Sequence, residues 1–392
     1  MKNMMNRRAL LRRGALAAGG LTLGSALPWG AVATPNAQPF WTNTPRMTTK
    51  PFNWWEYPLK AKLNANENKF GPSKLAQLSL VENANKGNMY AHMEVQALIK
   101  KLADKEGVKP EQIILGPGST DLLEKIAVVT FMDGTGNVIS ADPAYMSVVR
   151  TAQGVGAEWK NIPNLPDWSH DLDAMYKAID KKTKLIYVCN PNNPTGAITD
   201  PKKLWDFCAK ASEKAPVFVD EAYLDFMDDK DQKSMVGLIN EGKDIIIART
   251  FSKIHGMAGL RVGYVVAKED RIKSIDGILR SSYNLCVTSL KAAMASLEDT
   301  AYLKMSQAKN KEGREFISSE FDKMGIEYIP SYTSFIFFKL KGIEGEAYMK
   351  GMYENGVGVR LFEIDGQPWG RVSMGTMDEL KMFSQTLKNV LS

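Results

Sequence analysis

The stretch RTFSKIHGMAGLRVGY, Arg249 to Tyr264, decides how this chain is interpreted. In it a lysine, Lys253, follows a serine, and two glycines three residues apart precede an arginine. A helix does not explain this composition, because each glycine destabilises a helix by about 1 kcal/mol relative to alanine. The apolar run 244–250 just before it predicts a buried strand, so Lys253 is expected directly beyond a strand end. The composition is therefore constrained by something other than local stability.

The rest of the chain predicts an α/β protein of more than one domain, since single cores stop growing at about 250–300 residues and this chain has 392. Helix-like segments such as 119–132 and 201–215 alternate with short apolar runs, which favours a mainly parallel sheet covered on both faces. The predicted strands are 111–116, 136–142, 184–190, 215–223, 244–250 and 261–267. After about residue 295 a long amphipathic helix (about 299–324) and fewer strands predict a smaller α+β domain.

Polar residues follow these predicted strands one after another. Ligands of open α/β sheets bind beyond the carboxyl ends of the strands, so the residues there are candidates for one site. Each group has an ordinary explanation as a helix cap, a turn or a surface charge. Together they supply phosphate donors, an aromatic ring, an amide, an acid and a lysine, which are the parts that a pyridoxal phosphate site requires. The candidates are Gly118, Ser119, Thr120, Tyr145, Asn193, Asp220, Tyr223, Ser252 and Lys253.

Three motifs carry a resemblance to a known family. SKIHGMAGLRVGY (252–264), CNPNNPTG (189–196) and VDEAY (219–223) resemble, in order and spacing, the class I/II aminotransferases of fold type I. LNANENKFGP (63–72) is similar to the N-terminal signature of the histidinol-phosphate aminotransferase branch. The resemblance spans nearly the whole chain after its leader. It implies the PLP-dependent transferase fold type I, with a mainly parallel, seven-stranded type of sheet between helices.

The domains expected along the chain are a signal peptide at 1–33, an arm and part of the small domain at 34–87, a large cofactor domain at 88–295 and a small domain at 296–392. The resemblance also implies a role for each candidate. Lys253 would be the Schiff-base lysine, Asp220 would hold the pyridine nitrogen, and Tyr145 would stack on the ring. Asn193 and Tyr223 would contact the ring hydroxyl. The phosphate would be held by Gly118, Ser119, Thr120, Ser252 and Arg261.

Four further residues are implied outside the strand ends. Tyr90 resembles a tyrosine that reaches the phosphate of the partner subunit, which implies a homodimer, although MYAHMEV lacks the Pro-Asp that commonly follows it. Arg371 in WGRVSMGT resembles the arginine that binds a substrate carboxylate or phosphate. Arg360 is either a second positive charge for the substrate or an exposed strand residue. Asn66, in LNANENKFGP, is expected to bind substrate.

The function implied is amino transfer from an amino acid or amino-phosphate donor to a 2-oxo acid such as 2-oxoglutarate. A decarboxylase or lyase of the same fold stays open, because the reaction depends on which Cα bond is perpendicular to the cofactor ring. A non-catalytic cofactor-binding protein is the other alternative.

The three histidines have no metal-site spacing, and His255 is interpreted as a variable side chain on its turn. The three cysteines have no CxxC spacing and are expected to be buried thiols.

The first 33 residues read as a targeting segment. NRRALLRR is followed by a glycine-rich apolar run and by AVA, which resembles a twin-arginine signal peptide and predicts export of a protein folded and loaded in the cytoplasm. An uncleaved anchor and a disordered basic tail are the alternatives. Five of the six net positive charges lie in this leader. The remainder is close to neutral, which argues against nucleic-acid binding. No other run reaches about 18 apolar residues, so no stable membrane insertion is expected.

Overall fold

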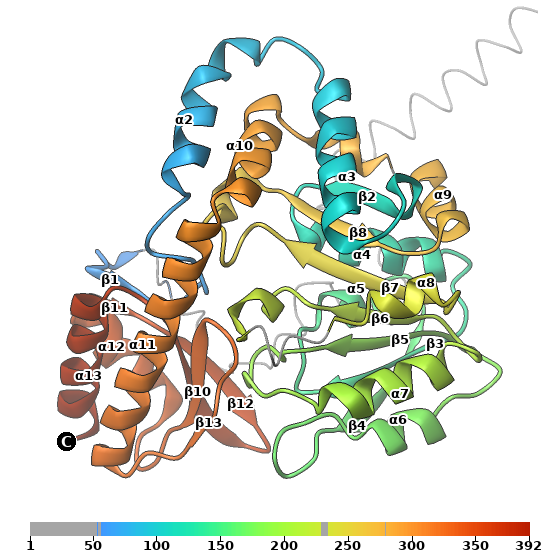
Figure 1. Ribbon diagram of the computed structural model, residues 1–392. Helices are drawn as coiled ribbons and strands as arrows, with labels where there is room; N and C mark the ends of the chain where they lie inside the picture. The colour runs from blue at the N-terminus through green and yellow to red at the C-terminus, as the bar shows by residue number, and fades with distance from the viewer. Residues whose placement is uncertain (1–52, 54–55, 229–233, 279) are drawn as a thin grey trace, which may run out of the picture. The chain divides into compact units, whose positions relative to one another are not determined.

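The computed structural model describes residue 53 and residues 56–228, 234–278 and 280–392 (Figure 1). The leader, its cleavage site and most of the predicted arm lie outside the described residues, and the predictions about them remain predictions. Residues 52–392 form one compact unit. Within the described residues no helix is both long and apolar enough to cross a membrane.

A seven-stranded sheet forms the centre of this unit and confirms the predicted α/β class. Its order is β2-β8-β7-β6-β5-β3-β4. β8 runs antiparallel to both of its neighbours, whereas the other pairs are parallel, so all strands except β8 point the same way. The strands are β2 (Ile113–Gly116), β3 (Asn137–Asp142), β4 (Glu158–Pro163), β5 (Thr183–Cys189), β6 (Val217–Asp220), β7 (Ile245–Thr250) and β8 (Gly263–Val266).

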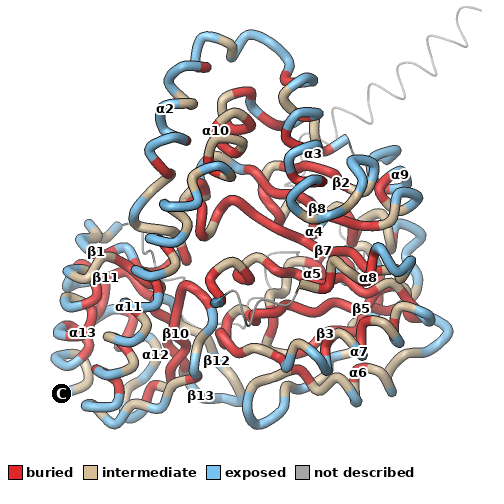
Figure 2. Tube along the Cα trace, viewed as in Figure 1, coloured by how far each residue is buried: buried red, intermediate tan, exposed pale blue. Residues whose placement is uncertain are grey.

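The apolar runs are continuous because both faces of the sheet are buried (Figure 2). Successive side chains of a strand point to opposite faces, and Ile113 and Leu115 accordingly join one core while Ile114 joins the other. β4, at the sheet edge, was not predicted, because its sequence EWKNIP is polar and partly exposed.

Different helices cover the two faces. The first core includes side chains from α3 (His92–Glu106), α6 (Leu172–Lys177), α7 (Pro201–Ala211), α8 (Gly237–Asn240) and α10 (Val287–Glu298). α2 (Lys74–Glu82) packs on α10. The second core includes side chains from α4 (Ser119–Phe131), α5 (Ser147–Gly154) and α9 (Glu269–Ile278).

The C-terminal part has its own sheet and core. The predicted helix at about 299–324 is confirmed as α11 (Thr300–Met324). An antiparallel sheet of order β12-β13-β10-β9 lies beside it with α12 (Gly345–Glu354) and α13 (Met377–Leu391) (Figure 1). Its strands are β9 (Tyr328–Ile329), β10 (Phe335–Lys339), β12 (Arg360–Ile364) and β13 (Gln367–Ser373). β1 (Ala61–Lys62) pairs with β11 (Val357–Gly358), so the segment that precedes LNANENKFGP is anchored to this part.

The expectation of three buried thiols was wrong for one of them. Cys189 lies in β5 and Cys208 in α7, and both are buried and free. Cys286 is free and exposed, because it precedes the first turn of α10 rather than facing the core.

Candidate functional site

The predicted site residues come together because β2, β3, β5, β6 and β7 end at one edge of the sheet. Lys253, three residues after β7, donates from Nζ to the Asn66 carbonyl at 3.2 Å. The same Nζ lies 5.5 Å from the centre of the Tyr223 ring. Burial, together with the charge of Arg371, lowers the pKa of Lys253 to about 8. A lysine in this state loses its proton more readily than an exposed one.

Asp220, the last residue of β6, is a buried carboxylate. The Tyr187 hydroxyl donates to its Oδ2 at 3.2 Å, and the Ala222 N–H donates to its Oδ1 at 3.1 Å. Burial raises the pKa of Asp220 to about 6 despite these bonds. No ion pair holds the Asp220 carboxylate within the described ranges. A buried acid of this kind is suited to a ligand that donates a charged N–H.

Tyr223 and Asn66 form the opposite side of the Lys253 environment. The Asn66 Nδ2 donates to the Tyr223 hydroxyl at 2.9 Å, and Ser373 both accepts from the Asn66 N–H and donates to its Oδ1. The Asn66 side chain, expected to bind substrate, is therefore at the site, and both its amide nitrogen and its amide oxygen already have a protein partner. Its backbone has φ 52°, a left-handed conformation that asparagine tolerates better than most residues.

The N-terminus of α4 forms a cradle for an anion. Gly118 precedes the helix with φ 84° and provides no side-chain cap, so the first N–H groups of α4 have no capping acceptor there. The Arg261 guanidinium donates to the Pro117 carbonyl at 3.1 Å and to Ser252 Oγ at 3.5 Å. A Cβ on Gly118 would lie 2.2 Å from Arg261 Nη2. Ser119 begins the helix and Thr120 Oγ1 lies 3.2 Å from the Tyr145 hydroxyl.

This arrangement fits the phosphate of a cofactor, because backbone N–H groups, hydroxyls and a guanidinium meet at one helix terminus. Burial raises the pKa of Tyr145, so its phenol stays neutral near the helix. The cradle, the buried acid and the lysine of lowered pKa are the three features that a pyridoxal phosphate group needs, and the residues present fit it.

Arg371 has the properties of a ligand-binding cation. Its Nη1 donates to Asn193 Oδ1 at 2.6 Å, and its guanidinium carbon lies 5.0 Å from the Phe335 ring and 5.2 Å from the Phe362 ring. Its Nε is buried without a hydrogen-bond partner among the described residues. Burial lowers the pKa of Arg371 to about 10. A buried guanidinium with an unpaired donor is costly unless a ligand supplies an acceptor.

Arg360 and Tyr90 make fewer contacts with the other predicted site residues. Arg360 pairs with Arg371 in the register of β12 and β13, and its charge helps to lower the pKa of Arg371, but its own side chain is exposed. Tyr90 is 85% exposed, and its ring lies 5.9 Å from the ring of His92. Across residues 56–228 and the later described segments, the structure gives Tyr90 no contact with Lys253.

His255 is buried rather than displayed on its turn, and its Nδ1 lies 2.7 Å from Ser296 Oγ. Burial lowers the pKa of His255 to about 4.

The sequence did not indicate Tyr187 and Ser373, which hydrogen-bond to Asp220 and Asn66. The available signal for Tyr187 was its position inside the apolar run of β5, since a tyrosine hydroxyl buried there needs a partner.

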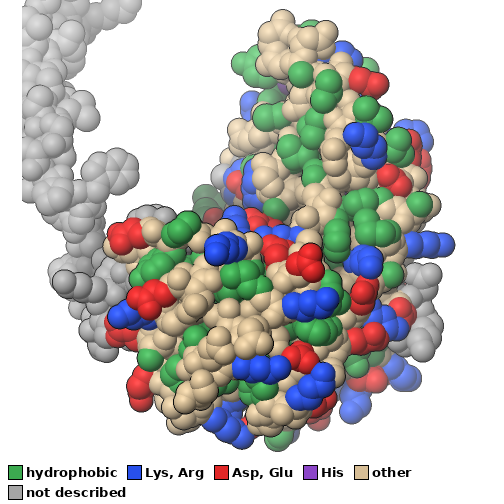
Figure 3. Space-filling model, turned by 90° about the vertical axis from the view of Figure 1, so that its left-hand side faces the viewer, with side chains coloured by type: hydrophobic (Ala, Val, Ile, Leu, Met, Phe, Trp, Pro, Cys, Tyr) green, Lys and Arg blue, Asp and Glu red, His purple; other side chains and the backbone are tan. Residues whose placement is uncertain are grey.

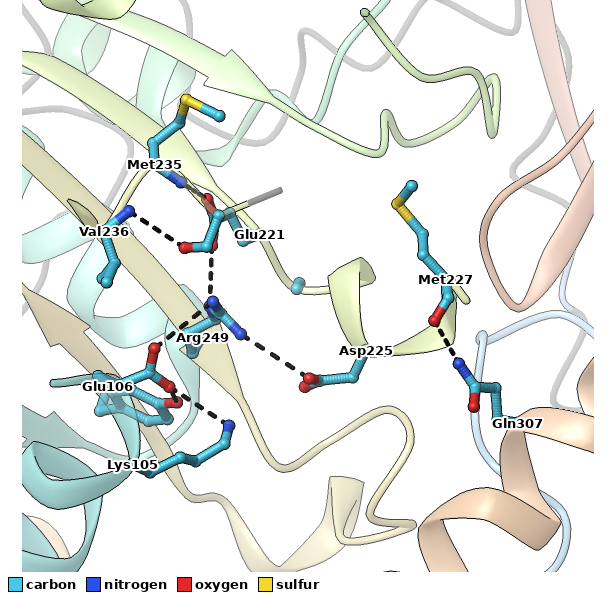
Figure 4. A network of polar contacts seen from close by, with 12 residues as sticks. Lys105, Glu106, Glu221, Asp225, Met227, Met235, Val236, Arg249 and Gln307 are labelled. Carbon is cyan, nitrogen blue, oxygen red and sulfur yellow. Dashed lines mark hydrogen bonds and ion pairs between the residues drawn. The ribbon is translucent and has the colours of Figure 1, made fainter. Parts of the chain in front are cut away.

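A buried ionic cluster around Arg249 was also missed (Figure 4). Arg249 of β7 pairs with Glu221 at 2.9 Å, with Glu106 at 3.6 Å and with Asp225 at 3.8 Å. Burial, partly offset by Arg249, raises the pKa of Glu221. Glu221 also accepts from the Met235 N–H at 2.8 Å. The cluster therefore holds the turn that begins directly after Asp220 of β6 and carries Tyr223.

Comparisons with known proteins agree with this geometry. The family model for aminotransferase class I and II matches residues 59–387. The histidinol-phosphate aminotransferase of Akkermansia muciniphila is 35% identical over 331 residues, covering 84% of this chain and 90% of that protein. That of Moorella thermoacetica is 34% identical over 333 residues, covering 84% and 85%. The histidinol-phosphate aminotransferase of Sinorhizobium meliloti, solved with pyridoxal-5'-phosphate, has a TM-score of 0.79 at 25% identity, covering 92% and 98%.

Proposed function

We propose, from the premise that this chain belongs to the class I and II aminotransferase family, that its amino donor carries an anionic group bound by Arg371. The chain is a transaminase, and its cofactor is pyridoxal 5'-phosphate. The proposal about the donor depends on the buried Arg371 Nε, which has no partner among the described residues. A carboxylate or a phosphate would accept from this fork at two atoms.

The residues proposed to hold the cofactor are those of the strand ends. Gly118, Ser119, Thr120, Ser252 and Arg261 would hold its phosphate, and Asp220 would accept from its ring nitrogen. Tyr145 would stack on its ring, with Asn193 and Tyr223 at the ring hydroxyl. When bound, the cofactor supplies an electron-poor ring that accepts the electron pair of a substrate Cα–H bond.

Lys253 is proposed to move the proton. A pKa of about 8 leaves roughly a tenth of Lys253 in the neutral form at pH 7, far more than for an ordinary lysine, which suits a general base at the substrate Cα. After it has taken this proton, Lys253 Nζ can return it to a neighbouring carbon. Asp220 is held in the charged form when a cationic N–H faces it, since an opposite charge lowers the pKa of an acid.

The acceptor is proposed to be a 2-oxo acid such as 2-oxoglutarate, whose carboxylate Arg371 would bind in the second half-reaction. The curated relatives named above are histidinol-phosphate aminotransferases, which supports an amino-phosphate or an amino acid as donor. Arg360 would add a second positive charge for the larger anion.

Single-turnover spectroscopy tests this function. Purified protein loaded with cofactor should lose its visible absorbance when an amino donor is added, and Lys253→Ala should abolish this reaction. Lys202→Ala changes an exposed lysine on α7 and should react as the wild type does. A Lys253→Ala protein that transaminates glutamate at the normal rate would refute the assignment of Lys253. Release of carbon dioxide instead of a keto product would favour a decarboxylase.

A homodimer with shared sites is proposed for the assembly. Support comes from apolar side chains that reach the surface on and near α2 (Figure 3). They include Leu75, Leu78, Val81, Met89, Tyr90, Met93 and Tyr283. A surface of this kind is typical of an interface.

Subunit mixing tests this assembly. Lys253→Ala and Tyr90→Ala subunits, each with low activity alone, should regain activity when they are mixed and allowed to exchange. Exchange without any recovered activity would refute the shared site, and a monomer in sedimentation would refute the dimer.

Export through the twin-arginine route is proposed from the leader. Replacing Arg7 and Arg8 by lysine should retain the protein in the cytoplasm, as measured by cell fractionation. An unchanged distribution between the compartments would refute the twin-arginine assignment.

A further inference from the structure

A short chain of hydrogen bonds joins the end of β13 to Tyr223. Ser373 Oγ donates to Asn66 Oδ1 at 2.7 Å, and Asn66 Nδ2 donates to the Tyr223 hydroxyl at 2.9 Å. All three side chains are buried. The partners come from three distant parts of the sequence, so only the fold brings them together.

The direction of each bond follows from counting protons. The Asn66 backbone N–H donates to Ser373 Oγ at 2.8 Å, so the serine oxygen already accepts one bond. The one hydroxyl proton of Ser373 then needs an acceptor, and Asn66 Oδ1 is the atom within reach. This bond fixes the orientation of the Asn66 side-chain amide, because the oxygen and the nitrogen of an amide are told apart by their hydrogen-bond partners. The amide nitrogen therefore faces Tyr223.

The consequence lies at the Tyr223 hydroxyl. Because Asn66 Nδ2 is a donor, the phenol oxygen accepts, and the phenol proton is left for another acceptor. Among the described residues the structure gives the Tyr223 hydroxyl no second partner. With the amide reversed, Asn66 Oδ1 would accept the phenol proton, and Tyr223 would have none to offer a ligand.

We infer that Ser373 is a positioning residue that holds the Asn66 amide so that Tyr223 donates its proton to the bound cofactor. This inference rests on the proposed role of Tyr223 at the ring hydroxyl. Ser373 lies two residues after Arg371 on β13, so the two side chains lie on the same face of the strand. The strand that binds the substrate anion thereby also sets the hydrogen bond at the cofactor.

The test measures the pH midpoint of the visible cofactor absorbance. A hydrogen bond donated to an anionic oxygen stabilises the deprotonated form, so its loss raises the midpoint. Tyr223→Phe should raise it by about one to two pH units, the effect of one hydrogen bond to a charged group. Ser373→Ala should raise it by about half to one unit. In the Tyr223→Phe background Ser373→Ala should add nothing, because the bond through which it acts is already gone.

Two controls separate positioning from structure. Ser373→Thr keeps the hydroxyl and should restore the wild-type midpoint. Ser384→Ala removes another buried hydroxyl, which donates to Glu320 at 2.6 Å away from the site, and should leave the midpoint unchanged. The inference is overturned if Ser373→Ala leaves the pH midpoint of the cofactor absorbance unchanged. It is also overturned if Ser373→Ala shifts the midpoint as much in the Tyr223→Phe background as it does in the wild type.

A cofactor-free measurement distinguishes this failure from failure of the proposed function. Urea unfolding of Ser373→Ala, Tyr223→Phe and the double variant should show coupling, because the two residues share Asn66. Additive losses overturn the hydrogen-bond chain whether or not cofactor binds. If the wild-type protein shows no visible cofactor absorbance, or if that absorbance does not depend on Lys253, the proposed function is refuted. The unfolding measurements still test the role of Ser373 in that case.

Discussion

Replacing Arg249 by methionine is expected to destabilise the protein strongly and in a pH-dependent way. The Arg249 side chain is 5% exposed and its guanidinium pairs with three carboxylates, the nearest being that of Glu221 at 2.9 Å, whose side chain is 2% exposed. At an effective dielectric constant of about 20, one such pair attracts by roughly 6 kcal/mol before desolvation is counted. Removing one partner of a buried pair typically costs about 3–5 kcal/mol, because the remaining charge is left buried without compensation. The free energy of unfolding should fall by about that amount at pH 8.

The pH dependence distinguishes lost charge from lost packing. Burial already raises the pKa of Glu221 in the folded protein, and without Arg249 this pKa rises further, while the pKa of Glu106 loses the lowering effect of Arg249. The folded state then binds more protons than the unfolded state, so the stability of the variant increases as the pH falls. The loss relative to wild type should therefore be clearly smaller at about pH 5.5 than at about pH 8.

The assay is urea unfolding of the cofactor-free proteins at both pH values. Arg271→Met is the matched control, because Arg271 pairs with Asp244 at 2.5 Å but both side chains are about one quarter exposed. A pair in that position is expected to contribute no more than about 1 kcal/mol. Equal losses for Arg249→Met at both pH values would refute the electrostatic reasoning, and a loss no larger than that of the control would refute the role of burial.

Three further changes address the site itself. Asp220→Asn should stabilise the cofactor-free protein at pH 8 by up to about 3 kcal/mol, because the pKa of about 6 lies two units above its ordinary value, and the gain should vanish below about pH 4. Lower stability in urea at pH 8 would contradict this. Gly118→Ala, which puts a Cβ at φ 84° and 2.2 Å from Arg261 Nη2, should weaken cofactor binding in a fluorescence titration by roughly tenfold or more. Gly107→Ala, at φ 68° with no atom within 4 Å, should leave that affinity unchanged, and equal effects would argue against the cradle. Arg371→Lys should raise the KM for anionic donors by about tenfold or more, because lysine lacks the planar fork, and an unchanged KM would exclude Arg371 from substrate binding.

Much of the fold and the site can be predicted from local patterns. Continuous apolar runs such as 244–250 indicate strands buried on both faces, and the polar residues after each run identify the edge where ligands bind. β4 could not be predicted in this way, since an edge strand with exposed residues lacks the apolar run. Cys286 was misjudged for a related reason, because burial of a residue next to a helix terminus depends on where the helix packs.

The sequence by itself determined the class of sheet, the set of chemical groups at its edge and the family, because these depend on residues close together in the chain. Only the tertiary structure decided which polar atoms become partners across long separations. Ser373 and Asn66 are 307 residues apart, and neither residue type nor spacing indicates that their side chains form a hydrogen bond. The same holds for Arg249 and Glu106, whose charges are tolerable in the core only because folding places them within 3.6 Å.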